Sequence, residues 1–203
     1  MNVALVGVTG RVGSRLLAEL LRRGHRVTGI ARDTSKLASQ PRLTLKNGDA
    51  NQPEQLAPLL AGHDAVLVAL KFATLDTASL LGAVKQAGVK RLLVVGGAGS
   101  LDVAPGHALI DTPDFPPAYK PESAAALRFL DVLREERQLD WTFLSPSAEF
   151  DPGPRTGTFR VGGDQLLSDA TGRSWISMED YAIAFVDELE TPKHSRQRFT
   201  VGY

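Results

Sequence analysis

The sequence predicts an α/β fold in which a parallel sheet carries helices on both faces. Short runs rich in β-branched residues and leucine alternate along the chain with segments of helical spacing, and this alternation is typical of a doubly wound parallel sheet. Most connections between these segments are short, as expected for consecutive elements of one layered domain. The 203 residues fit one domain, 1–203, since single domains commonly run to about 200 residues.

Each strand is indicated by a short apolar run, and each helix by apolar residues on one face. The run Val3 to Val6 has almost no polar interruption, which is typical of a strand buried on both faces. The expected strands are residues 3–6, 26–30, 43–46, 64–70, 91–95 and 141–144, and residues 199–201 can add a last one. Helices are expected over residues 11–23, 75–87 and 124–138, with a shorter one between Pro53 and Gly62 and a final one capped by Ser177.

Two segments depart from this alternation. Between Gly96 and Pro121, five prolines indicate a long ordered loop. Residues 153–172 are rich in glycine and are expected to be irregular chain with short strands. Neither segment is repetitive or of low complexity.

Composition and charge exclude several classes of protein. Lys plus Arg equals Asp plus Glu at 23 each, so we expect no nucleic acid and no membrane as partner. The chain has no cysteine, which excludes disulfides, zinc–thiolate sites and cysteine nucleophiles. Its four histidines lack metal-ligand spacing, so we expect no metal. There is no apolar stretch of about 20 residues and no basic leader, and we expect a soluble, cytoplasmic protein, either a monomer or a homodimer.

A glycine-rich turn, Gly7-Val8-Thr9-Gly10-Arg11-Val12-Gly13, follows the first strand and opens the first helix. Glycines in this context permit a tight turn and a close approach of the backbone to a pyrophosphate, whose charge is met by the helix amino terminus. We therefore predict a Rossmann-like dinucleotide-binding domain, with Gly7, Thr9, Gly10, Val12 and Gly13 around the phosphates. The alternative is a turn that is rich in glycine only for packing.

The end of the second strand predicts which dinucleotide binds. A carboxylate there binds the ribose hydroxyls of NAD, whereas an arginine accommodates the 2′-phosphate of NADP. Arg32 occupies the end position and Asp33 follows it, while Arg11 and Lys36 add positive charge nearby. Guanidinium groups bind phosphate well, so NADP(H) is favoured over NAD(H). Two alternatives remain: Asp33 can turn inward, or these charges are simply solvated.

After the third strand, Asn47-Gly48-Asp49-Ala50 is a second candidate segment. Asp49 is placed to accept a hydrogen bond from the adenine amino group, with Ala50 beside it. An ordinary turn explains the same residues equally well.

These segments together resemble the atypical short-chain dehydrogenase/reductase group of NAD(P)H-binding proteins, and within it the small bacterial proteins described as NADH-flavin reductases. The resemblance covers nearly the whole chain and rests on residues 7–13, 92–101, 141–147, 152–157 and 176–182. It implies that residues following three strands surround the nicotinamide end of the cofactor, namely Leu70 and Lys71, Gly97 and Ala98, and Ser145, Pro146 and Ser147. Parallel sheets bind ligands at this same edge.

Most short-chain dehydrogenases also carry a Tyr-x-x-x-Lys pair, whose lysine lowers the tyrosine pKa for proton transfer. Here the matching stretch is Tyr119-Lys120-Pro121-Glu122-Ser123, so serine stands in place of the lysine. Tyr119 and Ser100 are the two candidate catalytic residues, and the sequence suggests no others. The alternative role for Tyr119 is an aromatic anchor that packs the proline-rich loop over the site.

We therefore expect an NAD(P)H-dependent reductase that transfers hydride to a flavin (FMN or FAD), a quinone or a similar planar acceptor. Such an acceptor depends less on an enzyme acid than an isolated ketone does. Two alternatives stay open, a non-catalytic NADP(H)-binding redox-sensing regulator and an NAD-dependent epimerase- or dehydratase-like sugar enzyme. Residues 145–180 are expected to form a small segment on the substrate side, in which Arg155 is a candidate contact for an acidic substrate group.

Overall fold

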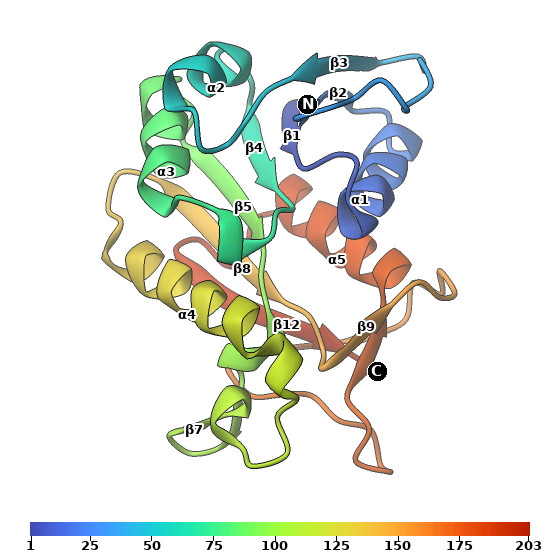
Figure 1. Cartoon of the computed structure of the whole chain (residues 1–203). Coiled ribbons are helices and arrows are strands. Elements are labelled where there is room, and N and C mark those ends of the chain that lie inside the picture. The colour runs from blue at the N-terminus through green and yellow to red at the C-terminus, as the bar shows by residue number, and fades with distance from the viewer.

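The apolar runs of the sequence form the strands of one large sheet, and the amphipathic segments form five helices (Figure 1). The computed structural model describes all residues, 1–203. The large sheet contains β1 (Asn2–Val6), β2 (Arg26–Ala31), β3 (Leu43–Asn47), β4 (Ala65–Val68), β5 (Arg91–Val95), β8 (Asp140–Ser145), β10 (Arg160–Gly162) and β12 (Gln197–Gly202). The helices are α1 (Arg11–Arg22), α2 (Pro53–Leu60), α3 (Thr77–Gln86), α4 (Lys120–Glu135) and α5 (Met178–Glu190).

The order of the eight strands is β10-β12-β8-β5-β4-β1-β2-β3. Every pairing is parallel except that of β10 with β12. From β1 the chain builds outward through β2 and β3, then crosses back to β4 and builds toward the other edge. Strand order therefore reverses between β1 and β4, which is the place where such sheets bind ligands. The predicted α/β class with a doubly wound sheet is confirmed.

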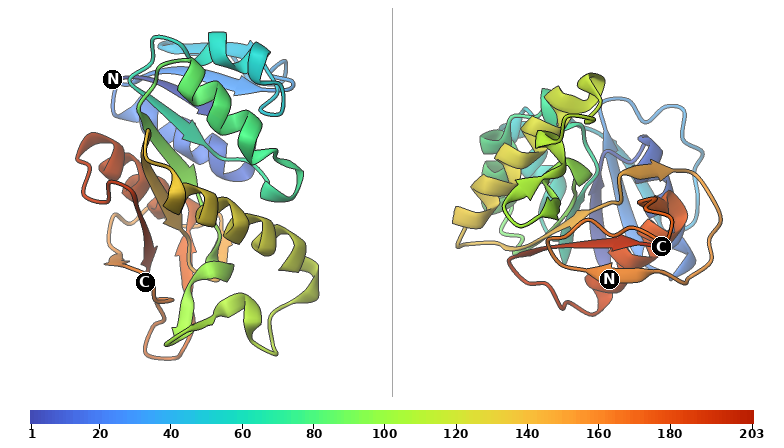
Figure 2. Two further views of the ribbon diagram at one scale, coloured as in Figure 1. Left: turned by 90° about the vertical axis from the view of Figure 1, so that its left-hand side faces the viewer. Right: turned by 90° about the horizontal axis from the view of Figure 1, so that it is seen from below.

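Two hydrophobic cores lie on the two faces of the sheet, because successive strand side chains point in opposite directions. Ala4 and Val6 of β1 join the core under α2, α3 and α4, whereas Val3 and Leu5 join the core under α1 and α5. Figure 2 shows the helices distributed on the two sides of the sheet in this way. The near absence of polar residues in β1 follows from this double burial.

The segments without clear periodicity form short elements. The proline-rich loop contains the 3-10 turns η2 (Ala98–Ser100), η3 (Leu109–Asp111) and η4 (Pro117–Tyr119), and the ribbon of β6 (Asp102–Ala104) and β7 (His107–Ala108). A second small sheet pairs β9 (Glu149–Asp151) with β11 (Trp175–Ser177). One further 3-10 turn, η1 (Phe72–Thr74), follows β4. None of the helices combines the length and the apolar character that crossing a membrane requires.

Candidate functional site

A cleft of about 460 Å³ lies beyond the carboxyl ends of β1, β2 and β4 and beside the loop that follows β3. It is therefore at the reversal of strand order. Eight residues that the sequence suggested for cofactor binding line this cleft: Gly7, Thr9, Gly10, Arg32, Asp49, Ala50, Leu70 and Lys71.

The glycine turn packs too tightly for any side chain at two of its positions. Gly7 has a φ of +93°, and a Cβ there would lie 2.2 Å from the carbonyl oxygen of Ala69. A Cβ on Gly13 would lie 2.0 Å from the carbonyl oxygen of Gly7. Glycine at these positions lets α1 start close against β1 and the end of β4, and it opens the turn toward the cleft.

The same turn presents backbone donors that no protein group uses. The N–H groups of Thr9, Arg11, Val12 and Gly13 make no hydrogen bond within the protein. The helix α1 also lacks a side-chain cap at Gly10 and an acidic residue in its first turn. Unpaired N–H groups at a helix amino terminus form a site for an anion. The turn therefore fits the diphosphate of a dinucleotide.

At the end of β2, the two charged residues have different surroundings. Arg32 lines the cleft and has no ion-pair partner. Asp33 instead accepts the N–H of Ser35 at Oδ1 over 2.9 Å, and this hydrogen bond lowers the pKa of Asp33 below its ordinary value. The carboxylate is thus engaged by its own turn, while the guanidinium of Arg32 is free to bind an anion. Lys36 is exposed and lies outside the residues that line the cleft.

Asn51 joins two walls of the cleft, a role that no sequence pattern indicates. Its Nδ2 donates to the carbonyl oxygen of Thr74 over 2.8 Å, and its Oδ1 accepts the N–H of Asp76 over 2.8 Å. The neighbouring Asp49 accepts the N–H of Asn51 at Oδ1 over 3.0 Å. The loop after β3 and the chain after η1 are therefore held together beside the cleft.

Glu122 makes a comparable contact from the first turn of α4. Its two carboxylate oxygens accept the N–H groups of Phe72 over 2.7 Å and of Ala73 over 2.9 Å. Both donors belong to η1, which directly follows the cleft residues Leu70 and Lys71. No local pattern reveals the contact, because the partners are 50 and 49 residues apart in sequence.

The two candidate catalytic residues lie in unfavourable surroundings for proton transfer. Tyr119 is 65% exposed and its hydroxyl makes no hydrogen bond. The expected role of Tyr119 as a packed aromatic anchor is wrong, since η4 turns this side chain into solvent. Ser100 is buried, and both its Oγ and its carbonyl oxygen accept hydrogen bonds from Arg198. Ser123 lies against Gly99, where a Cβ would come within 2.7 Å of Ser123 Cβ.

The remaining residues suggested for the cofactor do not line the cleft. Arg11 points its guanidinium to Asp151 of β9 over 2.6 Å, and Val12 packs against the core under α1 and α5. Gly97 lies in the chain after β5. Ser145 is the last residue of β8, and Pro146 and Ser147 follow it. The Oγ of Ser145 is buried without a hydrogen-bond partner, whereas that of Ser147 donates to the carbonyl oxygen of Val201.

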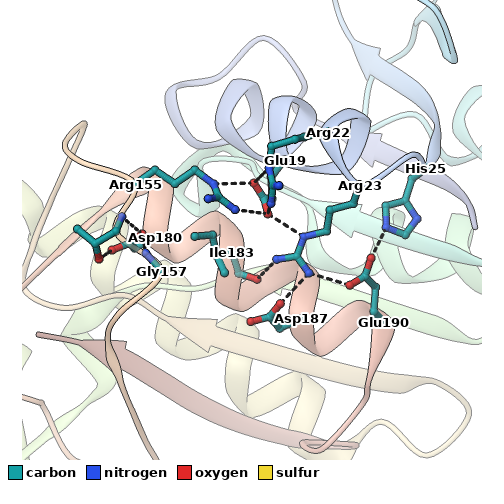
Figure 3. A network of polar contacts seen from close by, with 11 residues as sticks. Glu19, Arg22, Arg23, His25, Arg155, Gly157, Asp180, Ile183, Asp187 and Glu190 are labelled. Carbon is teal, nitrogen blue, oxygen red and sulfur yellow. Dashed lines mark hydrogen bonds and ion pairs between the residues drawn. The ribbon is translucent and has the colours of Figure 1, made fainter.

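Arg155 does not lie free in solvent, and it is not available to a substrate in this arrangement. It binds Glu19 of α1 through Nε and Nη2, each over 3.1 Å (Figure 3). Arg22 and Arg23 bind the same carboxylate, which is 4% exposed. Burial alone would raise the pKa of Glu19, but the hydrogen bonds from the three arginines outweigh it and hold this pKa well below its usual range. The segment after β9 is thereby tied to α1.

A parallel sheet with an anion-binding turn at its reversal of strand order is the architecture of the dinucleotide-binding proteins. That is the class defined by this fold and cleft. The chain belongs to the NAD(P)H-binding family, whose sequence model matches residues 7–192. The family predicted from the motifs is confirmed.

Three relatives show how similar other members are. The uncharacterized protein YwnB of Bacillus subtilis is 41% identical, over 99% of this chain and 98% of its own. The structure of a candidate epimerase from Bacteroides thetaiotaomicron has a TM-score of 0.94 and 40% identity, over 100% of this chain and 96% of that one. The structure of a candidate NADH-flavin reductase from Streptococcus pneumoniae has a TM-score of 0.86 and 34% identity, over 100% and 99% of the two chains.

Proposed function

We propose that this protein is a reductase that uses NADPH in preference to NADH and reduces a planar acceptor such as a flavin or a quinone. The observation that carries the proposal is an intact anion-binding turn combined with a proton-transfer motif that lacks its lysine. The likeness to the candidate NADH-flavin reductase of Streptococcus pneumoniae supports the same class of acceptor.

The preference for NADPH is supported by the two charged residues at the end of β2. Arg32 faces the cleft without a carboxylate partner, and a guanidinium binds phosphate through charge-assisted hydrogen bonds. Asp33 also lines the cleft, but one of its two carboxylate oxygens already accepts the N–H of Ser35. The free cation and the engaged carboxylate both favour a nucleotide with a 2′-phosphate.

The class of acceptor is supported by the first turn of α4. Reduction of a ketone requires a proton on its oxygen, and an enzyme supplies it from a group of matched pKa within hydrogen-bond reach. Tyr119 is exposed and has no lysine one turn away. A bound reduced nicotinamide would supply a hydride, and a flavin or quinone delocalises the charge that it receives. The protein then has to orient the two rings and exclude water.

Other residues of the predicted site fit the nicotinamide half of the cofactor. Ser145 ends β8 with a buried Oγ that has no protein partner, and buried hydroxyls without a partner are rare. Because Ser145 is fully buried and does not line the cleft, a contact with the carboxamide of the nicotinamide would require the chain after β4 and β5 to move. Residues 145–180 would close the substrate side of the same edge.

The test is oxidation of NADPH and NADH by the purified protein, followed by absorbance against a panel of flavins, quinones and simple carbonyl compounds. We expect turnover with flavins or quinones and higher kcat/KM with NADPH. Reduction of simple ketones with flavins and quinones left untouched would contradict the proposal. Tight binding of NADPH without turnover of any acceptor would favour the sensing regulator.

Tyr119→Phe is the matched variant for the acceptor class. Because the hydroxyl of Tyr119 contacts no protein group, we expect the variant to keep the wild-type kcat. A large loss of kcat in this variant would identify Tyr119 as a general acid. Carbonyl compounds would then be the expected substrates.

A further inference from the structure

The short turn η1 is held by a carboxylate from a distant element. Glu122 of α4 accepts the first two N–H groups of η1, those of Phe72 and Ala73, one at each carboxylate oxygen. The residue before η1, Lys71, supplies no side-chain cap. Glu122 therefore does for η1 what a capping side chain usually does within a helix.

η1 is also part of the cleft wall. Leu70 and Lys71 immediately before it, and Thr74 at its end, line the cleft. Fixing the first two N–H groups of η1 fixes the direction in which the chain leaves β4. The placement of Leu70 and Lys71 in the cleft therefore depends on α4.

The strand order places this part of the wall on one half of a bound dinucleotide. β2 and β3 lie on one side of β1, and β4, β5 and β8 lie on the other. The turn proposed to bind the diphosphate follows β1, and Arg32, the proposed contact of the 2′-phosphate, follows β2. The nicotinamide half of the proposed cofactor consequently extends over β4 and β5, and the beginning of η1 faces that half.

The contact requires a carboxylate in particular. Two N–H donors are matched by two oxygens that both accept, and the charge strengthens each bond. A glutamine side chain of the same size would offer one accepting oxygen and would bring an NH₂ group against the other N–H. One of the two anchors of η1 would be lost with little change in volume.

We propose that Glu122 is a positioning residue for the nicotinamide half of the cofactor, acting through η1 on Leu70 and Lys71. In the first turn of α4, where related enzymes place the lysine of the proton-transfer pair, this chain instead uses a side chain that shapes the cofactor cleft. The inference rests on the proposed dinucleotide site, but it can fail independently of it.

The experiment compares two ligands by calorimetry. NADPH contains both halves of the cofactor, whereas adenosine 2′,5′-bisphosphate contains only the adenosine half and its 2′-phosphate. For Glu122→Gln we expect an increase in Kd for NADPH of about tenfold and a change in Kd for the bisphosphate of less than about twofold. Glu136→Gln is the matched control at the opposite end of α4, where the carboxylate accepts the N–H of Gln138 outside the cleft; both affinities should be unchanged.

Each other outcome is decisive. An equal loss of affinity for both ligands, or no loss for either, would overturn the role of Glu122 while leaving the dinucleotide site intact. A wild-type protein that binds neither ligand would overturn the proposed function itself. Thermal melting without ligand checks the folding of the variant. If the glutamine variant is unfolded, Glu122→Asp replaces it, because a side chain one methylene shorter cannot reach both N–H groups; the same loss of affinity for NADPH alone is expected.

Discussion

Arg32 and Asp33 are neighbours at the end of β2, yet only the Asp33 side chain has a partner within the protein. The sequence left open which of them faces a nucleotide, because either side chain can turn inward from a strand end. Both residues line the cleft, but Oδ1 of Asp33 already accepts the N–H of Ser35, while Arg32 has no ion pair. This short-range hydrogen bond supports the proposed preference for a 2′-phosphate over free ribose hydroxyls.

Arg32→Glu should therefore raise KM for NADPH far more than KM for NADH. Loss of one charge-assisted hydrogen bond to phosphate costs about 2 kcal/mol, which corresponds to about a 30-fold rise in KM for NADPH. Steady-state kinetics with both nucleotides measure this. Lys36→Glu makes the same charge reversal outside the cleft and should leave both constants near those of the wild type. Equal effects of Arg32→Glu on NADPH and NADH would show that Arg32 does not bind the 2′-phosphate.

Some cleft residues could be predicted from sequence because their signals are local. Gly7 and Gly10 belong to a short motif, and Arg32 follows a recognisable strand. Asn51 and Glu122 could not be predicted, since their partners lie about 25 and 50 residues away and depend on the packing of other elements. The exposure of Tyr119 could not be predicted either, because the orientation of one side chain in a proline-rich loop depends on the conformation of the whole loop.

At the scale of elements, Asn51 and Glu122 hold the two ends of one wall of the cleft. Asn51 fixes the end of η1 to the loop after β3, and Glu122 fixes its beginning to α4. The wall of the cleft is thus held at both ends, which the proposed cofactor pose places toward its adenosine and nicotinamide halves. The two anchors should consequently have separable effects on binding.

Asn51→Ala should weaken binding of NADPH and of adenosine 2′,5′-bisphosphate by similar factors, about tenfold each, since it removes two hydrogen bonds beside the proposed position of the adenosine half. Calorimetry with both ligands provides the measurement. Asn2→Ala, which removes a long hydrogen bond to Gly62 at the opposite end of β1, is the control. A loss confined to NADPH would mean that Asn51 acts on the nicotinamide half instead.

The start of α5 was predicted from the cap residue, and the structure confirms it. Ser177 Oγ accepts the N–H of Asp180 over 3.0 Å and donates to the carbonyl oxygen of Pro154. Ser177→Ala should lower the free energy of unfolding by about 1 kcal/mol, the usual contribution of a cap. Urea unfolding measures the change, and the exposed Ser39→Ala should leave it within error. An unchanged midpoint for Ser177→Ala would contradict a stabilising cap.

Elements with several turns or a long apolar run were predictable, whereas the shortest ones were not. β10 has three residues in a glycine-rich stretch, which is too short for a periodic signal. The predicted helix 124–138 begins four residues later than α4, because the proline-rich stretch up to Pro121 hides a start that proline in the first turn in fact allows. The shortest strands form only because they pair with a strand that is distant in the sequence, as β10 pairs with β12.

At the scale of the whole molecule, the network around Glu19 joins α1, α5 and the segment after β9 (Figure 3). Arg23 links Glu19 to Asp187 and Glu190 of α5 over 2.7 Å each. The pKa of Glu19 is lower in the folded protein than in the unfolded chain. Its contribution to stability is therefore present above the unfolded carboxyl pKa and is lost as pH falls toward the folded value.

The wild type should accordingly lose stability below about pH 5, and Glu19→Gln should lose less over the same range because an amide does not titrate. The two proteins should differ most near neutral pH, where the charged Glu19 binds three arginines. Urea unfolding from pH 7 to pH 3 measures both curves. Glu54→Gln, at an exposed glutamate without an ion pair, should follow the wild type. Parallel curves for wild type and Glu19→Gln would exclude a stabilising role for this carboxylate.

The two strands at the borders of the large sheet have a consequence for how the molecule behaves in concentrated solution. A long, flat and apolar border strand offers unpaired backbone groups to another chain and promotes aggregation. Here β10 has only three residues, and β3 exposes Thr44, Lys46 and Asn47. The short β10 at one border and the polar residues of β3 at the other both disfavour pairing with a strand of another molecule. We therefore expect the sheet not to extend between molecules at high protein concentration.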